Sequence, residues 1–162
     1  MTIKVGDRIP PAITLKYWTA EGIKETTSDE LFRGKKIALF AVPGAFTPTC
    51  SMRHLPGFVD HASELKAKGV DQIACISVND AFVMGAWGKE HKAEGKVAML
   101  ADGSGEFARA VGLELDLTKA GLGKRSQRYS MLVEDGVVTA LSIDPPGQFE
   151  VSSAEAMLKA LG

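Results

Sequence analysis

Cysteine is scarce in this chain, with only Cys50 and Cys75 among 162 residues. The first six residues lack the apolar stretch of a secretory signal. Two cysteines without such a signal argue against a scaffold of structural disulfides, which is typical of small secreted domains. We therefore expect a reducing, cytoplasmic setting, unless a targeting peptide has been cleaved from the chain. In that setting a disulfide would be one step of a reaction cycle.

The chain also lacks an excess of charge of one sign. Lysine and arginine number 19 against 20 aspartates and glutamates, and the net charge is −1. No basic block marks a nucleic-acid-binding protein, and the apolar runs are too short to cross a bilayer. His54 and His61 lie seven residues apart without a third converging ligand, which argues against a metal site. We expect no nucleic-acid, membrane or metal partner.

Hydrophobic residues are plentiful at 45% of the chain, enough for the core of one domain spanning residues 1–162. Short apolar runs alternate with longer amphipathic segments, which predicts an α/β fold with a central mixed β-sheet flanked by helices on both faces. An N-terminal hairpin precedes the main part of this sheet. Strands are expected at 14–18, 23–26, 36–42, 72–78, 98–101, 129–133 and 137–143, and helices at 29–32, 50–68, 80–92, 105–111 and after 153.

Capping and breaking residues refine these boundaries. Ser28 and Ser104 are the N-cap candidates for the helices at 29–32 and 105–111. Pro56 lies within the helix expected at 50–68, where a kink or a loosened first turn should result. Glycines and basic residues dominate 121–126, which predicts a flexible loop there.

Cys50 lies at the start of a predicted helix, directly after the turn that follows the apolar strand 36–42. A helix N-terminus carries partial positive charge and free N–H groups, and both favour a thiolate over a thiol. We therefore expect Cys50 to be a nucleophile at neutral pH.

The residues before Cys50 favour the reaction of its sulfur with an electrophilic oxygen compound. Pro43 and Pro48 restrict the backbone of the turn, and the Thr47 hydroxyl is placed to reach the N–H or the sulfur of Cys50. Free N–H groups of the turn could bind an oxygen atom that approaches the sulfur. A thiolate beside such donors can attack a peroxide O–O bond, and a nearby arginine would stabilise the developing charge.

The pattern Pro43-x-x-x-Thr47-x-x-Cys50 resembles the active-site motif of the peroxiredoxins. The fuller string at 42–51 is similar to the type II, peroxiredoxin-5-like branch, and so are the strings at 55–58, 77–80 and 125–129. The resemblance covers nearly the whole chain. It implies a thioredoxin-like fold and a thiol peroxidase that reduces hydrogen peroxide and small alkyl hydroperoxides. It implies no cofactor beyond an external thiol reductant.

The resemblance also assigns roles to single residues. Cys50 would be the peroxidatic cysteine, which becomes a sulfenic acid, and Thr47 would hydrogen-bond the sulfur and the peroxide. Pro43 would shield the thiolate from water. Arg128 would stabilise the thiolate and polarise the peroxide. The N–H groups of Cys50 and Gly44 would complete the peroxide site.

Dimer formation is implied by the same resemblance, because type II relatives form dimers through the face near the active site. Phe46, next to the motif, is the candidate for a wall of the substrate pocket or a dimer contact. Phe82 and Trp87 on the helix at 80–92 are more often core or interface residues than substrate ligands. A homodimer is therefore expected.

Two routes could return the sulfenic acid to a thiol. In plant-like relatives a cysteine in a string comparable to that around Cys75 resolves the intermediate within the same chain. Cys75 lies in the middle of a predicted buried strand, however, and a disulfide requires Cα atoms within about 7 Å. Local unwinding of the Cys50 turn, assisted by Pro56, could bring the two cysteines together, and our hypothesis is that Cys75 resolves the intermediate. Thioredoxin, or glutathione with glutaredoxin, is the alternative reductant.

Two other functions are compatible with a reactive Cys50. The first is a redox sensor or relay, which passes the oxidation of Cys50 to a partner protein. The second is a cysteine hydrolase in which His54, four residues further on the same helix face, is the base. A partly exposed helix residue is the simpler interpretation of His54.

Overall fold

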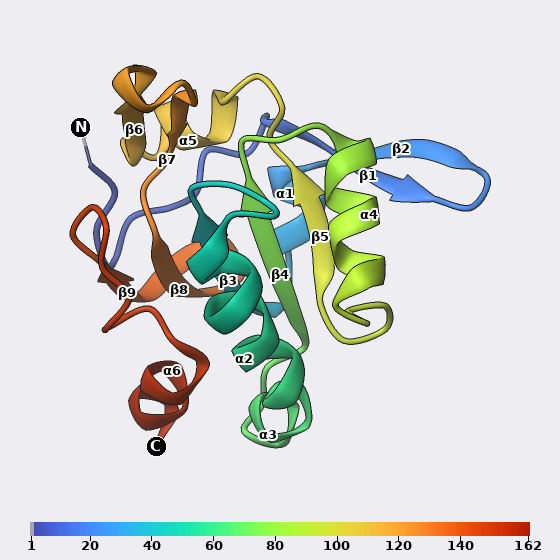
Figure 1. Ribbon diagram of the computed structural model, residues 1–162. Coiled ribbons are helices and arrows are strands. Elements are labelled where there is room, and N and C mark those ends of the chain that lie inside the picture. The colour runs from blue at the N-terminus through green and yellow to red at the C-terminus, as the bar shows by residue number, and fades with distance from the viewer. Residues whose placement is uncertain (1) are drawn as a thin grey trace.

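The computed structural model describes residues 2–162 and is built around one seven-stranded mixed sheet (Figure 1). Its strand order is β2-β1-β5-β4-β3-β8-β9. The predicted N-terminal hairpin is present, and its loop end projects from the sheet in Figure 1. The strands are β1 (Thr14–Thr19), β2 (Gly22–Thr27), β3 (Lys36–Val42), β4 (Gln72–Ser77), β5 (Ala98–Ala101), β8 (Tyr129–Glu134) and β9 (Val137–Ile143).

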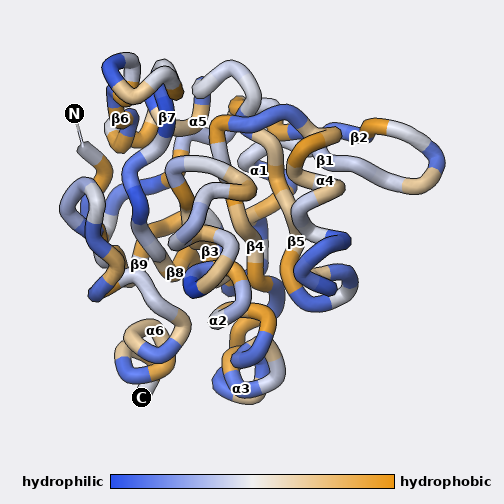
Figure 2. Tube along the Cα trace, in the orientation of Figure 1, coloured by the Kyte–Doolittle hydropathy of each residue, from blue (hydrophilic) through white to orange (hydrophobic). Residues whose placement is uncertain are grey.

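The three central strands, β3, β4 and β5, run parallel, and antiparallel strands extend the sheet on both sides. β3 is buried from Ile37 to Val42, as its continuous apolar sequence predicts for a strand covered on both faces. The hydrophobic segments in Figure 2 accordingly concentrate on these central strands. The carboxyl ends of β3 and β4 meet at one edge of the sheet, as predicted.

Helices cover both faces of the sheet, and each face has its own core. Alternate residues of β3 divide between them, with Phe40 facing one core and Leu39 the other. The first face carries α2 (Leu55–Asp60), α3 (Ala62–Ala67), α4 (Ala81–Glu90) and α6 (Ala154–Leu161). The second carries α1 (Ser28–Phe32) and α5 (Glu106–Ala110). None of the helices formed by residues 2–162 is long and apolar enough to cross a membrane.

The prediction of a flexible loop at 121–126 is wrong. Residues Gly123–Ser126 form strand β7, which pairs antiparallel with β6 (Glu114–Leu117) in a separate two-stranded sheet. A short 3₁₀ helix, η2 (Thr118–Ala120), and Gly121 in the left-handed conformation make the turn between them. The glycines that suggested a flexible loop therefore belong to the turn and edge of a hairpin.

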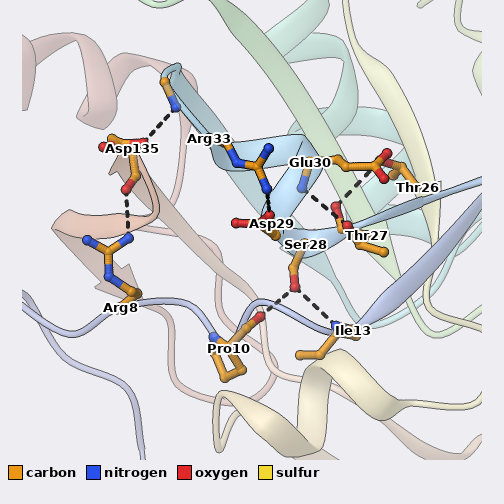
Figure 3. Close-up of polar contacts among 11 residues, drawn as sticks. Arg8, Pro10, Ile13, Thr26, Thr27, Ser28, Asp29, Glu30, Arg33 and Asp135 are labelled. Atoms are coloured by element: carbon orange, nitrogen blue, oxygen red, sulfur yellow. Dashed lines mark hydrogen bonds and ion pairs between the residues drawn. The ribbon is translucent and has the colours of Figure 1, made fainter.

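The start of α1 also differs from the prediction by one residue. Thr27, rather than Ser28, is the N-cap, and its hydroxyl accepts a hydrogen bond from the N–H of Glu30. The Ser28 hydroxyl instead donates to the carbonyl of Pro10 and accepts from the N–H of Ile13 at 3.2 Å (Figure 3). Ser28 thus attaches the N-terminal segment to the helix.

The single helix expected at 50–68 is three segments. It begins with a π-helical turn, η1 (Cys50–His54), in which the N–H of Leu55 donates to the carbonyl of Cys50. Pro56 follows directly and has no N–H to donate, so the loosened first turn is confirmed. A further interruption at His61 separates α2 from α3 and was not predicted.

Asp102, not Ser104, caps α5. Its buried carboxylate accepts the N–H groups of Phe107 and Ala108, both at 3.0 Å, whereas Gly105 at the N-cap position has no side chain to contribute. Asp102 follows β5, so the cap connects the end of a central strand to the helix behind the sheet.

We expect Asp102→Ala to lower the free energy of unfolding by about 1–2 kcal/mol, because two helix N–H groups lose their buried acceptor. Ser104→Ala is the matched control and should change it by less than about 0.5 kcal/mol. Urea denaturation of both variants measures the difference. Equal effects would contradict the assignment of the cap.

Candidate active site

Cys50 occupies the first position of the π-helical turn η1, immediately after the turn that leaves β3. Its side chain is fully buried. The Nη2 of Arg128 donates a hydrogen bond to the sulfur over 3.1 Å. Hydrogen bonds from an ionised donor are about twice as strong as neutral ones, and this one favours a negatively charged sulfur. The structure therefore brings together the two residues that the sequence marks as nucleophile and activator.

The sheet register places Arg128 beside Cys50. β8 runs antiparallel to β3, and Tyr129 at its start pairs with Ala41 near the end of β3 (Figure 1). Arg128 therefore lies at the sheet edge from which the chain continues into the Cys50 turn. Residues 78 positions apart in sequence meet there because two neighbouring strands run in opposite directions.

Thr47 makes a different contact from the one expected. Its hydroxyl donates to the carbonyl of Gly44 over 2.6 Å, and its own carbonyl accepts the N–H of Ser51 over 2.9 Å. The expectation that the hydroxyl reaches the N–H or sulfur of Cys50 is wrong for this structure. Because the hydroxyl proton is used within the turn, the oxygen lone pairs are left as acceptors.

The turn at residues 43–49, between β3 and η1, is here called the active-site turn. Hydrogen bonds attach it to the rest of the molecule from two sides. The Oδ1 of Asn79, which follows β4, accepts the N–H of Ala45 over 3.0 Å. From the other side, Arg125 on β7 donates to the carbonyl of Pro43 over 3.4 Å. A Cβ on Gly44 would lie 3.0 Å from the Nη1 of Arg125 and from the Cγ2 of Thr47, so a larger residue there would require these side chains to shift. The role of Asn79 was not recognised from the sequence.

Phe46 lies on the outside of the same turn. Its backbone is in the left-handed region, with φ of 64°, and its side chain is 49% exposed. Such a conformation costs a non-glycine residue free energy, and residues held in it cluster at functional sites. Trp87 is a core residue and donates to the Ser51 hydroxyl over 2.9 Å, whereas Phe82 is exposed.

His54 is buried, and its interpretation as a partly exposed helix residue is wrong. Its Nε2 lies 2.9 Å from the carbonyl oxygen of Ser152, and its Nδ1 lies 2.8 Å from the Nη1 of Arg128. Both ring nitrogens are thus occupied by partners other than Cys50. This arrangement contradicts the cysteine hydrolase hypothesis, which requires the imidazole to take the proton of the thiol.

Cys75 lies in β4 and packs in the same core as Cys50. It is fully buried, as the sequence predicts. Burial, reinforced by the neighbouring Cys50, raises the pKa of the Cys75 thiol well above its usual range. Because the thiolate is the reactive form, Cys75 is a weak nucleophile while the fold is intact.

A cavity of about 230 Å³ opens beside Arg128. Pro43 and Thr49 of the active-site turn line one side, and Leu115 and Pro145 contribute apolar surface. The cavity is therefore continuous with the motif that carries Cys50 and has room for a small molecule.

Burial, followed by the positive charge of Arg128, lowers the pKa of His54 from 6.5 to about 3. The folded chain therefore leaves His54 neutral between these values, whereas the unfolded chain protonates it. As the pH falls from 6.5 towards 3, this difference should lower the free energy of unfolding by up to about 1.4 kcal/mol per pH unit. Denaturation of His54→Gln over this range should give a shallower pH slope than the unaltered chain. Identical pH slopes for His54→Gln and the unaltered chain would contradict the lowered pKa of His54.

Comparisons with known proteins identify the family of the chain. The family model described as Redoxin matches residues 4–158. The chain is 57% identical to Peroxiredoxin-2E-2, chloroplastic, of Oryza sativa subsp. japonica, across 99% of this chain and 73% of that relative. It is 52% identical to Peroxiredoxin-2B of Arabidopsis thaliana, across 98% of both chains.

Solved structures show the same relationship. Reduced Prx3 from Vibrio vulnificus in complex with H₂O₂ is similar with a TM-score of 0.95 and 55% identity, over 99% of this chain and 100% of that one. Peroxiredoxin 5 from Alvinella pompejana is similar with a TM-score of 0.85 and 41% identity, over 98% and 97%. The type II resemblance and the thioredoxin-like fold are thereby confirmed. The chain belongs to the peroxiredoxins, the thiol peroxidases of the redoxin family.

Proposed function

We propose that Cys50 is the peroxidatic cysteine of this thiol peroxidase and that Arg128 activates it. The observation that carries the proposal is the contact of 3.1 Å between the Arg128 guanidinium and the buried Cys50 sulfur. A permanently charged group at this distance stabilises the thiolate and can also donate to the oxygen of an approaching peroxide.

The proposed reaction is a displacement at oxygen. The Cys50 sulfur forms a bond to the terminal oxygen of hydrogen peroxide or a small alkyl hydroperoxide while the O–O bond breaks. The bonding electrons pass to the leaving oxygen, which takes up a proton and departs as water or alcohol. The sulfur is oxidised to sulfenic acid and the peroxide is reduced, so the step needs no metal or organic cofactor.

Three residues of the active-site turn would hold the peroxide in place. The Thr47 hydroxyl, which donates to Gly44, can accept a hydrogen bond from the peroxide O–H. The N–H groups of Gly44 and Cys50 would donate to the peroxide oxygens, and Pro43 would keep water from the sulfur. We assign Phe46 to the wall of the substrate pocket or to a contact between subunits, because its ring is half exposed beside the turn.

External thiols are the proposed reductants. A first thiol, from thioredoxin or glutathione, condenses with the sulfenic acid to a mixed disulfide and water. A second thiol attacks that disulfide and releases Cys50, with glutaredoxin catalysing the glutathione route. The raised pKa of Cys75 disfavours attack by this residue in the folded state. A Cys50–Cys75 disulfide would require the η1 turn to open first.

We further propose that residues 1–162 act as one catalytic domain in a homodimer. One sheet with a core on each face supports a single domain. The exposed rings of Phe46 and Phe82 offer apolar surface for a second subunit. The cytoplasm is the proposed location on the sequence argument from scarce cysteine, although two relatives are named as chloroplastic.

Replacing Cys50 by serine removes the nucleophile, and we expect no peroxide reduction above background. Arg128→Gln should lower the second-order rate constant with hydrogen peroxide by about 100-fold or more, because a preorganised charged donor is lost. Stopped-flow mixing of the prereduced protein with peroxide measures both. Cys75→Ser is the control and should react at the unaltered rate. An unaffected Arg128→Gln variant would contradict the proposed activation.

The reduction route can be mapped by mass spectrometry. After one equivalent of peroxide and then one equivalent of glutathione, we expect glutathione bound to Cys50, with Cys75 still available for alkylation after denaturation. A peptide pair joined through Cys50 and Cys75 would instead establish the intramolecular route. Sustained peroxide consumption with thioredoxin or glutaredoxin would indicate an enzyme. Rapid oxidation of Cys50 with negligible turnover would indicate a redox sensor.

A further inference from the structure

Strands β1 and β5 are antiparallel neighbours in the sheet, yet they pair at a single position, where Lys16 lies opposite Ala101. The same register continued along the strands would place Trp18 opposite Met99, but no pair forms there. β1 instead continues into the hairpin whose loop end projects from the sheet (Figure 1). The edge of β5 over residues 98–100, which pairs with β4 on its other side, therefore has no strand partner on the side of β1.

A cavity of about 760 Å³ lies between the two strands. Consecutive residues of both strands line it, 17–19 of β1 and 98–100 of β5. Successive side chains of a strand point to opposite faces of a sheet, so a cavity that touches consecutive residues lies between the strands and not on one face. This cavity, bordered by residues 17–19 and 98–100, is here called the slot.

Helix α4 closes one face of the slot with side chains that are held in place. A Cβ on Gly85 would lie 2.6 Å from the Cβ of Trp18, and one on Gly88 would lie 2.7 Å from the Cγ of Met99. The two glycines thus let both side chains lie directly on the helix. The Nζ of Lys89 lies 3.9 Å from the centroid of the Trp18 ring, which is a cation–π contact. This face of the slot is therefore apolar and already formed.

Helix α1 borders the other face, and there the slot is acidic. Glu30 of α1 lines it, together with Glu21 of the hairpin turn and Glu94 after α4. All three side chains are exposed, and none forms an ion pair with another of residues 2–162. The cations that line the slot are Lys35 and the lysine that contacts the Trp18 ring. Three carboxylates thus face two ammonium groups, one of which is already engaged.

We propose that the slot binds an extended peptide segment of a partner protein, with apolar side chains towards α4 and basic side chains towards Glu30. The main chain of the segment would pair with β1 on one side and with β5 on the other, as peptides do at open strand edges. Its alternate side chains would reach Trp18 and Met99 on one face and the carboxylates on the other. Both the alternation of the peptide and its charge follow from the two faces of the slot.

The position of the slot separates it from the chemistry at Cys50. The slot is also lined by Gln72 and Val97, where β4 and β5 begin, whereas the active-site turn follows the carboxyl end of β3. A docked segment would therefore leave the peroxide site free. The inference goes beyond the proposed function, because it assigns to this fold a surface that holds the peroxidase next to a partner.

A titration of the reduced, unaltered chain with a short capped peptide of alternating valine and lysine tests the proposal. We expect NMR shift changes and slower amide hydrogen exchange at residues 17–19 and 98–100. The same peptide with N-methylated valines keeps its charge but cannot complete both ladders, and it should not bind. A peptide of alternating valine and glutamate should bind about tenfold more weakly or worse, because it meets like charges.

Matched variants test the charge of the slot. The double change Glu21→Gln and Glu30→Gln should raise the Kd of the valine–lysine peptide by about threefold to tenfold, as expected for the loss of two exposed ion pairs. Glu106→Gln removes an exposed carboxylate of α5, outside the slot, and should leave the Kd unchanged. Stopped-flow reduction of hydrogen peroxide should proceed at the same rate with and without saturating peptide, whatever the roles of Cys50 and Arg128.

Four results would overturn the proposal. The first is no binding of the valine–lysine peptide. The second is binding that alters the outer edge strands, β2 and β9, in place of the slot. The third is equal binding of the valine–glutamate or N-methylated peptide, which would indicate contact without strand pairing or charge selection. The fourth is strong protection of the slot amides in the free protein, which would show that another segment, such as a second copy of this chain, already occupies the slot.

Discussion

The contact between a guanidinium and a buried sulfur is the constraint on which this site depends. Taking an ion out of water costs several kcal/mol, and Cys50 is fully buried. Two opposite charges about 3 Å apart attract by about 5 kcal/mol at an effective dielectric constant of 20. This attraction is of the same order as the cost of burying one such ion.

The directions of two neighbouring strands bring Arg128 next to Cys50. β3 ends at the active-site turn, and β8 begins beside that end because the two strands are antiparallel. The π-helical start of the following helix places Cys50 and His54 where one guanidinium reaches both. The carbonyl oxygen of Ser152, in the segment before α6, lies 2.9 Å from the other ring nitrogen of His54. The groups around the Cys50 sulfur are thus positioned by β3, η1, β8 and the segment before α6.

Some features set by neighbouring residues were predictable from the sequence, whereas most contacts between distant residues of the site were not. The apolar run of β3 and the position of Cys50 follow from local pattern. The nearness of Arg128 came only from the family resemblance, because no local pattern reports a strand register. The burial of His54 depends on Phe149 and Ser152, which lie almost a hundred residues later. The cap by Asp102 was missed because the chain passes through a left-handed glycine before the helix begins.

Thiolate absorbance at 240 nm tests the central claim most directly, since it reports the charge of the sulfur in the resting protein. The reduced Cys75→Ser chain, whose one sulfhydryl is Cys50, is compared at pH 7 with the same chain carrying Arg128→Gln. The account predicts a thiolate signal in the first and its loss in the second. A reduced protein without thiolate absorbance, or one whose signal survives Arg128→Gln, would contradict it.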